Sequence, residues 1–246
     1  MTAATRLGLP IAVAVCVLAL PSAYGRPESA AARATALDQS LAAEIGRFVA
    51  SDQAAPTPAC QVLFVGSSSI VKWNSLANDM APMPVINRGF GGSHIEHVNR
   101  GFDKIVAPYR PRAIVFYAGD NDIDAGIPAD RVIADFDNFM SLKGQALGTT
   151  PVYFISVKPS KARFAELALQ AEVNEAVKAR AANRSDLIFV DVAALMLENG
   201  KPRDLFIADG LHMTPQGYAI WTRAVREALL PNTGAEERIC RQANKG

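Results

Sequence analysis

Short, unbroken apolar runs alternate with helical patterns between residues 60 and 230, and this alternation constrains the fold more than any other feature. The first run covers residues 62–65 and leads directly into Gly66 and three serines. Apolar runs of this length that end at turn residues are typical of strands buried on both faces. Four similar runs follow, at residues 84–87, 113–118, 152–156 and 187–190.

The segments between these runs have helical periodicity. Helices are expected over residues 95–106, 129–145, 164–182 and 215–229. Thr214 is the predicted N-cap of the last helix, and Pro215 takes its first position. Strands that alternate with helices form a parallel sheet covered on both faces by right-handed crossovers. The sequence therefore predicts one α/β domain.

The N-terminal 58 residues have a different character. Arg6 is the only charged side chain before an apolar run over residues 7–20, and a small-x-small site ends at Gly25. This layout predicts a signal peptide over residues 1–25, and therefore an exported (periplasmic or secreted) protein without stable membrane insertion after cleavage. An uncleaved N-terminal anchor is the alternative. Residues 26–58 then hold a flexible leader (26–36), an amphipathic helix (37–50) and a proline-marked connector.

The chain contains three cysteines, and Cys16 lies inside the predicted signal segment. Cleavage would leave Cys60, before the first strand, and Cys240, near the C-terminus. Because exported proteins can form disulfides, we hypothesise that these two cysteines pair and tie the C-terminal tail (233–246) to the base of the sheet. Two unpaired thiols are an equally open alternative.

The sequence has 25 basic and 24 acidic side chains, so bulk charge does not favour a nucleic-acid partner.

Unusual polar or glycine-rich stretches follow the predicted strands. These stretches comprise residues 66–69, 87–93, 119–122 and 158–160. Because the carboxyl ends of parallel strands share one edge of the sheet, these stretches are expected to converge. For Lys158, in the last of them, two interpretations are open: a residue that borders the pocket, or a solvated loop charge.

A serine in this position can be a nucleophile if a base and oxyanion donors accompany it. His212 lies three residues after Asp209 in a loop directly before the last helix, so the carboxylate can orient the imidazole. The backbone N–H of Gly92, the side-chain amide of Asn121 and the N–H of the serine itself are possible oxyanion donors. Neither a metal nor an organic cofactor is needed for this chemistry.

These four blocks together resemble the SGNH (GDSL-type) hydrolase family. The resemblance covers residues 60–230, and the domain is assigned to residues 59–232. It implies a flavodoxin-like three-layer α/β/α sandwich with a five-stranded parallel sheet. It also implies Ser68 as the nucleophile, Asp209 and His212 as its triad partners, and Ser68, Gly92 and Asn121 as oxyanion donors. One departure is Ser67, which stands where the family usually has aspartate, so the first block contains three adjacent serines.

Several alternatives accompany this interpretation. Residues 66–69 alone also suit a phosphate or helix-cap loop, and residues 209–212 alone suit a simple turn. Three aspartates at 120, 122 and 124 resemble a calcium loop poorly, because Ala125 and Arg131 stand where glycine and glutamate belong. For the whole chain the expected activity is hydrolysis of small-molecule or polysaccharide esters. Acyl transfer with the same triad, or a non-catalytic carbohydrate- or lipid-binding module, remains open.

Overall fold

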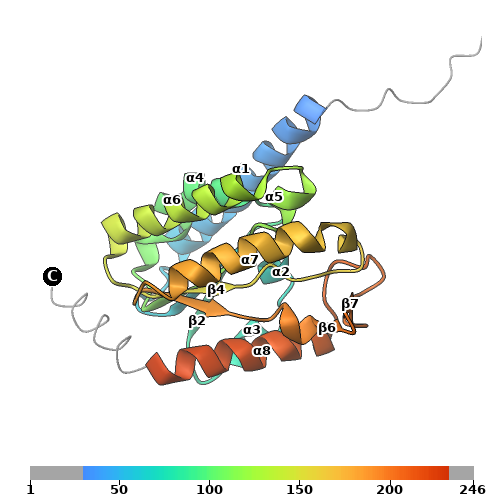
Figure 1. Cartoon of the computed structure of the whole chain (residues 1–246). Helices are drawn as coiled ribbons and strands as arrows, with labels where there is room; N and C mark the ends of the chain where they lie inside the picture. The colour runs from blue at the N-terminus through green and yellow to red at the C-terminus, as the bar shows by residue number, and fades with distance from the viewer. Residues whose placement is uncertain (1–29, 233–246) are drawn as a thin grey trace, which may run out of the picture.

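A five-stranded parallel sheet forms the centre of the computed structural model, which describes residues 30–232 (Figure 1). The strand order is β2-β1-β3-β4-β5, which is the flavodoxin-like order. Gly66 of β1 lies opposite Gly89 of β2 and Tyr117 of β3, so the segments that follow these three strands emerge side by side. The strands are β1 (Val62–Gly66), β2 (Val85–Gly89), β3 (Ala113–Tyr117), β4 (Val152–Ile155) and β5 (Leu187–Val190).

Helices cover both faces of the sheet and complete the predicted three layers (Figure 1). Leu63 and Val65 of β1 pack into the core of one face, while Val62 and Phe64 pack into the core of the other. This alternation explains the unbroken apolar run, because both faces of β1 are buried. The first face carries α1 (Ala30–Ala54), α4 (Ile95–Ile105), α6 (Ala129–Leu147) and α7 (Leu167–Ala181), and the second carries α2 (Ser68–Val71), α3 (Leu76–Met80) and α8 (Pro215–Leu229).

A polar cluster fastens the C-terminal end of α1 to the sheet. The guanidinium of Arg88 on β2 donates to Asp52 of α1 at 2.6 Å and lies over the ring of Phe48. The hydroxyl of Tyr109 donates to the other carboxylate oxygen of Asp52 at 2.5 Å. Burial raises the pKa of Tyr109 to about 12, so the phenol stays protonated and keeps this bond. The N-terminal helix is therefore a fixed part of the fold.

The structure corrects some expected boundaries. Residues 30–36, expected in a flexible leader, belong to α1, because alanine favours helix even without an amphipathic pattern. Apolar periodicity also missed short elements, since one turn of helix is too short to show a period. These are α5 (Asp120–Asp124), the hairpin of β6 (Leu197–Glu198) and β7 (Lys201–Pro202), and the 3-10 helices η1 (Ala107–Tyr109), η2 (Phe164–Glu166), η3 (Ala194–Met196) and η4 (Leu230–Asn232), in addition to α2 and α3.

Three sequence predictions fall outside the described residues: the signal peptide (1–25), the C-terminal tail (233–246) and the place of Cys240. Cys60 is disulfide-bonded, and its predicted pairing with Cys240 stays a prediction. Among the helices in residues 30–232, we find none with the length and apolar character that a bilayer crossing requires.

Candidate active site

Ser68 lies where β1 turns directly into α2. Gly66 has a φ of +138°, and a Cβ on this residue would lie 1.8 Å from the carbonyl oxygen of Tyr117, so only glycine fits the turn. Of the three adjacent serines, Ser67 and Ser69 are buried, whereas Ser68 is partly exposed. The turn thus presents the middle serine at the carboxyl edge of the sheet.

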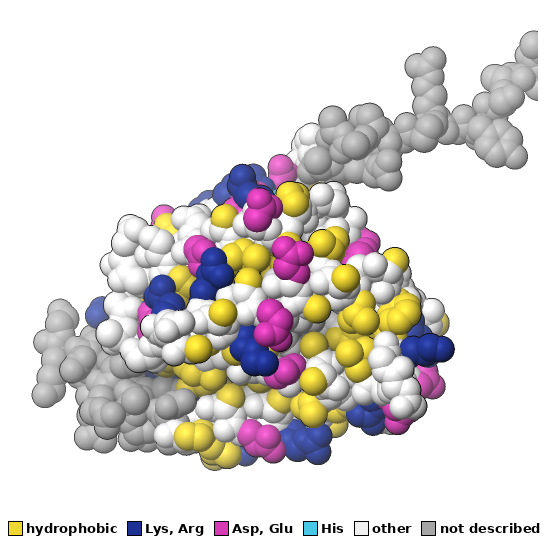
Figure 2. Space-filling model, viewed as in Figure 1, with side chains coloured by type: hydrophobic (Ala, Val, Ile, Leu, Met, Phe, Trp, Pro, Cys, Tyr) yellow, Lys and Arg dark blue, Asp and Glu magenta, His cyan; other side chains and the backbone are white. Residues whose placement is uncertain are grey.

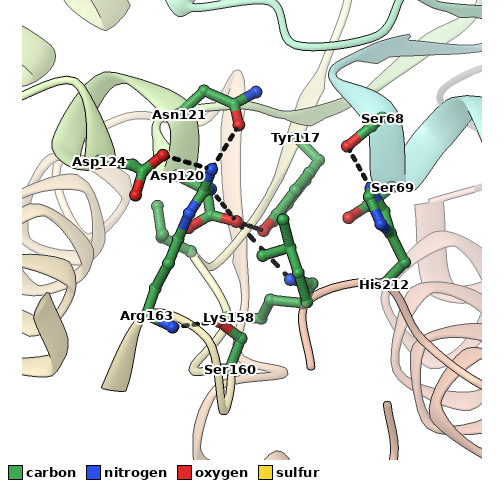
Figure 3. Close-up of polar contacts among 12 residues, drawn as sticks. Ser68, Ser69, Tyr117, Asp120, Asn121, Asp124, Lys158, Ser160, Arg163 and His212 are labelled. Atoms are coloured by element: carbon green, nitrogen blue, oxygen red, sulfur yellow. Dashed lines mark hydrogen bonds and ion pairs between the residues drawn. The ribbon is translucent and has the colours of Figure 1, made fainter. Parts of the chain in front are cut away.

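Ser68, His212 and Asp209 form one hydrogen-bonded chain. Figure 3 shows its contact between Ser68 and His212. Nε2 of His212 lies 2.9 Å from the Oγ of Ser68, and Nδ1 lies 2.6 Å from Oδ2 of Asp209. Oδ1 of Asp209 accepts the backbone N–H groups of Leu211 and His212, both at 2.9 Å. Burial raises the pKa of Asp209, but the hydrogen bonds from His212 and Leu211 outweigh burial and hold this pKa well below its ordinary value.

The ionised carboxylate decides which imidazole nitrogen carries the proton. A carboxylate can only accept, so Nδ1 of His212 donates to Asp209 and Nε2 is left to accept from the hydroxyl of Ser68. The structure therefore brings together the three residues predicted as a triad. This arrangement can remove the serine proton as the oxygen attacks an acyl carbon.

Several contacts hold the loop of His212 against α2. Thr214 caps α8 with its side chain, as predicted. The hydroxyl of Tyr218, in the first turns of α8, donates to the carbonyl of Ser69 at 3.0 Å. The carbonyl of Gly210 accepts a backbone N–H at 3.0 Å from the loop that follows β4. These bonds place the imidazole beside a residue that is 144 positions away in the sequence.

The predicted oxyanion donors lie on segments that follow neighbouring strands. The N–H of Ser68 is at the start of α2, Gly92 lies after β2 with a φ of +73°, and Asn121 lies in α5 after β3. The amide of Asn121 donates to the carbonyl of Ser93 at 3.0 Å, which joins the last two segments. No hydrogen bond within residues 30–232 runs from Gly92 or Asn121 to Ser68.

Sequence reasoning missed Arg163, which lies in the loop between β4 and α7 (Figure 3). Its Nη2 donates to Oδ1 of Asn121 at 3.1 Å and to Asp124 at 2.8 Å. Its Nη1 lies 3.0 Å from the carboxylate of Asp120. No spacing in the sequence could have linked these residues, because they meet only through the pairing of β3 with β4.

Lys158 corrects another expectation, because it is completely buried and not a solvated loop charge. Its ammonium lies 3.6 Å from the carboxylate of Asp120 and 5.7 Å from the centre of the Phe206 ring. Burial lowers the pKa of Lys158, and the negative charge of Asp120 opposes that shift. The apolar residues before Lys158 gave no indication of this, because the buried position results from the path of the chain after β4.

The three aspartates that weakly resembled a calcium loop point to different partners. Asp120 and Asp124 face Arg163, while Asp122 accepts the backbone N–H of Ile95 at 3.0 Å. Across residues 30–232, no group of three or more His, Cys, Asp or Glu side chains is arranged to hold a metal ion.

Comparisons with known proteins place the chain among structures of the same fold. A protein from Streptococcus pneumonia, described as a candidate platelet activating factor, is 16% identical, with a TM-score of 0.71 and coverage of 80% of this chain and 96% of that one. A GDSL-like lipase from Bacteroides thetaiotaomicron is 20% identical, with a TM-score of 0.66 and coverage of 76% and 97%. An acetylxylan esterase from Geobacillus stearothermophilus is 14% identical, with a TM-score of 0.55 and coverage of 70% and 94%.

A search of curated protein sequences gave no match. A sequence profile of the GDSL-like Lipase/Acylhydrolase family matches residues 64–220, which contain the whole hydrogen-bonded chain of Ser68, His212 and Asp209. The matched segment exceeds half of the sequence, and ester hydrolysis is the general activity that it supports. The chain therefore belongs to the GDSL-like lipase/acylhydrolase family.

Proposed function

We propose that this protein hydrolyses carboxylic esters through an acyl-enzyme on Ser68. The observation that carries the proposal is the continuous hydrogen-bonded chain from Ser68 through His212 to Asp209. Serine alone is a weak nucleophile, and an imidazole oriented by an ionised carboxylate supplies the base that it lacks. The partial exposure of Ser68 supports the same role, because the ester must reach its oxygen.

The reaction has two halves. In the first, His212 takes the hydroxyl proton as Ser68 Oγ attacks the ester carbonyl, and it returns this proton to the departing alcohol as the acyl–oxygen bond breaks. In the second, His212 takes a proton from water, which attacks the acyl-enzyme, and returns it to Ser68 as the acid leaves. Asp209 stays ionised and stabilises the imidazolium in both halves.

Each half passes through a tetrahedral oxyanion. We assign its stabilisation to the backbone N–H groups of Ser68 and Gly92 and to the side-chain amide of Asn121. These three residues lie on the segments that follow three neighbouring strands. Removal of one such donor typically lowers kcat by about 10²–10³-fold.

Acetyl and other short acyl esters of carbohydrates or lipids are the proposed substrates. Phe164 and Ile207 are exposed apolar side chains of the loop after β4 and of the loop of His212, which a hydrogen bond from Ala162 to Gly210 joins. An acyl or sugar group can bury such apolar surface without a deep cavity. A structural neighbour described as an acetylxylan esterase has the same fold, which supports testing acetylated sugars first. Basic and acidic side chains are interspersed over the face in Figure 2, so nucleic acid is not proposed as a partner.

Export through the N-terminal signal layout is part of the proposal. The disulfide at Cys60 supports it, because disulfides persist mainly outside the reducing cytoplasm. We expect peptide mass spectrometry of the non-reduced protein to find Cys60 linked to Cys240. Free thiol at Cys240, or Cys60 linked to another residue, would contradict this pairing.

Covalent labelling with a fluorophosphonate, followed by peptide mapping, tests the nucleophile. We expect the label on Ser68, its loss in Ser68→Ala, strong weakening in His212→Ala, and its retention in the matched Ser67→Ala variant. A label on Ser67 or Ser69, or no label on folded protein, would overturn the assignment. Product analysis with and without a xylo-oligosaccharide acceptor then separates hydrolysis from acyl transfer, since both share the acyl-enzyme.

A further inference from the structure

The side-chain amide of Asn121 has one acceptor end and one donor end, and each end has a fixed partner. Figure 3 shows the partner of the acceptor end, which is Arg163. Its Oδ1 accepts from Nη2 of Arg163 at 3.1 Å, and its Nδ2 donates to the carbonyl of Ser93 at 3.0 Å. A guanidinium can only donate and a carbonyl can only accept, so a flipped amide would lose both bonds. These contacts leave one N–H of Asn121 without an acceptor in the described structure.

Arg163 itself is held firmly. Its side chain is 10% exposed and is paired with Asp124 at 2.8 Å and Asp120 at 3.0 Å. Its backbone N–H donates to the hydroxyl of Ser160 at 3.2 Å. Because these contacts fix the guanidinium, its hydrogen bond to Oδ1 also fixes the orientation of the Asn121 amide.

A buried charge layer supports this contact from below. Asp120 lies between Arg163 and the completely buried ammonium of Lys158, and the hydroxyl of Tyr117 lies 3.5 Å from the same carboxylate. Lys158 has no hydrogen-bond partner within residues 30–232, so its charge is balanced by the ion pair with Asp120. Two cations thus alternate with the carboxylates of Asp120 and Asp124, which lie on either side of Asn121 in the sequence of α5.

We propose that Arg163 is a positioning residue that holds the Asn121 amide with its remaining N–H toward the oxyanion. This inference rests on the proposed ester hydrolysis. The guanidinium fixes which end of the amide faces the reaction, and its charge at Oδ1 polarises the amide and strengthens the N–H as a donor. The interaction grows as negative charge develops on the substrate oxygen, so it acts on the transition state more than on substrate binding.

A double-mutant cycle with Arg163→Met and Asn121→Ala tests the proposal, with kcat and KM measured on an acetyl ester. We expect Asn121→Ala to lower kcat by about 10²–10³-fold and Arg163→Met to lower it by about 10–10²-fold, with KM changed less than about threefold. The double variant should be no slower than Asn121→Ala alone, because Arg163 acts only through that amide. Arg163→Lys, which keeps a donor near Oδ1, should recover part of kcat.

Arg180→Met is the matched control, because Arg180 pairs with Asp137 through two hydrogen bonds of 2.7 and 2.8 Å on α7 and α6. It should keep wild-type kcat. Effects of Arg163→Met and Asn121→Ala that multiply in the double variant, or a wild-type kcat in Arg163→Met, would overturn the inference. If circular dichroism shows that Arg163→Met is unfolded, the cycle is run with Arg163→Lys, and the same criterion applies.

Ser68→Ala, measured in parallel, separates the two levels of the proposal. If Ser68→Ala keeps the full rate, the proposed function fails and the inference fails with it. If Ser68→Ala is inactive while the Arg163 cycle is multiplicative, ester hydrolysis stands and the role of Arg163 alone is overturned.

Discussion

At the scale of single residues, the site depends on which atoms face each other. Ser68 differs from its serine neighbours in its partial exposure and its contact with His212, although all three follow the same strand. Asp209 accepts three hydrogen bonds, so it has no freedom to rotate away from the imidazole. Ser68 and Asp209 are therefore distinguished from other serines and aspartates by how their side chains are oriented toward His212.

Asp209→Asn should lower kcat by about 10³–10⁴-fold while the protein stays folded. The amide that replaces Oδ2 donates to Nδ1 of His212, which moves the imidazole proton to Nε2 and prevents it from accepting the Ser68 proton. Steady-state kinetics on an acetyl ester measure the loss. Asp204→Asn is the control, because Asp204 is an exposed carboxylate of the same loop region that pairs with Lys161. Unchanged kcat in Asp209→Asn would contradict the triad.

Gly66→Ala should give protein that does not fold, because the added Cβ would lie 1.8 Å from a backbone carbonyl and φ is +138°. Gly144→Ala is the matched control, since Gly144 lies in α6 with no atom within 4 Å of a Cβ. That substitution should raise the free energy of unfolding by about 0.5–1 kcal/mol. Urea denaturation followed by circular dichroism measures both, and a stable Gly66→Ala protein would show that the turn tolerates a side chain.

At the scale of elements, α1 lies wholly outside the family match, which begins at residue 64, so its role has to be read from its contacts. The carboxylate of Glu44 accepts the backbone N–H of Gly91 at 3.0 Å. A Cβ on Gly92 would lie 3.2 Å from Leu37, so α1 packs directly on the segment with the proposed oxyanion donor. α1 thus packs against this segment. Near its C-terminal end, Asp52 of α1 is joined to β2 by the hydrogen bond from Arg88.

Glu44→Gln should keep part of the contact, whereas Glu44→Ala should lower kcat by about tenfold. The loss of the bond to Gly91 lets the segment with Gly92 move, which misplaces an oxyanion donor without unfolding the core. Kinetics and thermal unfolding measured together separate the two effects. Glu175→Ala on α7 is the control, because Glu175 is exposed and pairs with the exposed Lys178. A wild-type rate in Glu44→Ala would mean that α1 does not influence catalysis.

At the scale of the whole molecule, two buried groups in the α1–α4–α5 region respond to acid in opposite directions. Burial raises the pKa of Asp122 to about 6, so this group stabilises the fold when protonated, and the stabilisation is lost as pH rises through about 6. Burial lowers the pKa of His97 to about 4, with help from nearby His94 and Arg100. Neutral His97 therefore favours the fold above pH 6.5, and this contribution is lost as pH falls toward 4.

Substitution of one of these two groups should reveal the pH dependence of stability that the other contributes. Asp122→Asn keeps an acceptor for the N–H of Ile95 without a buried charge, so it should raise the free energy of unfolding at pH 7 by about 2 kcal/mol. It should also make stability fall more steeply between pH 6.5 and 4, while His97→Gln should flatten that fall. Urea titrations at a series of pH values measure both slopes. Parallel curves for the wild type and Asp122→Asn would show that the carboxyl does not titrate in this range.

The layered architecture and the four polar blocks could be predicted from the amino-acid sequence. Apolar runs buried on both faces leave few arrangements other than a parallel sheet between helices, and residues 187–190 and 215–229 were predicted with the bounds that the structure has. Ser68, Asp209 and His212 were predicted because the four polar blocks, in order along the chain, resemble those of the SGNH hydrolase family, although each block alone also suits a cap loop or a simple turn. The one-turn helices and the start of α1 were missed, because these segments have no regular spacing of apolar residues from which a helix can be recognised.

Which polar groups contact one another could not be predicted before the segments were packed together. Hydrogen bonds and ion pairs require donor–acceptor distances of about 3 Å, and differences of a few tenths of an ångström decide whether they form. Such positions are set only when strands pair and helices pack. The buried position of Lys158, the contact of Arg163 with Asn121 and the bond from Gly91 to Glu44 join residues from separate elements. Local sequence specifies what each segment can form, whereas the packing of segments specifies which side chains surround the site.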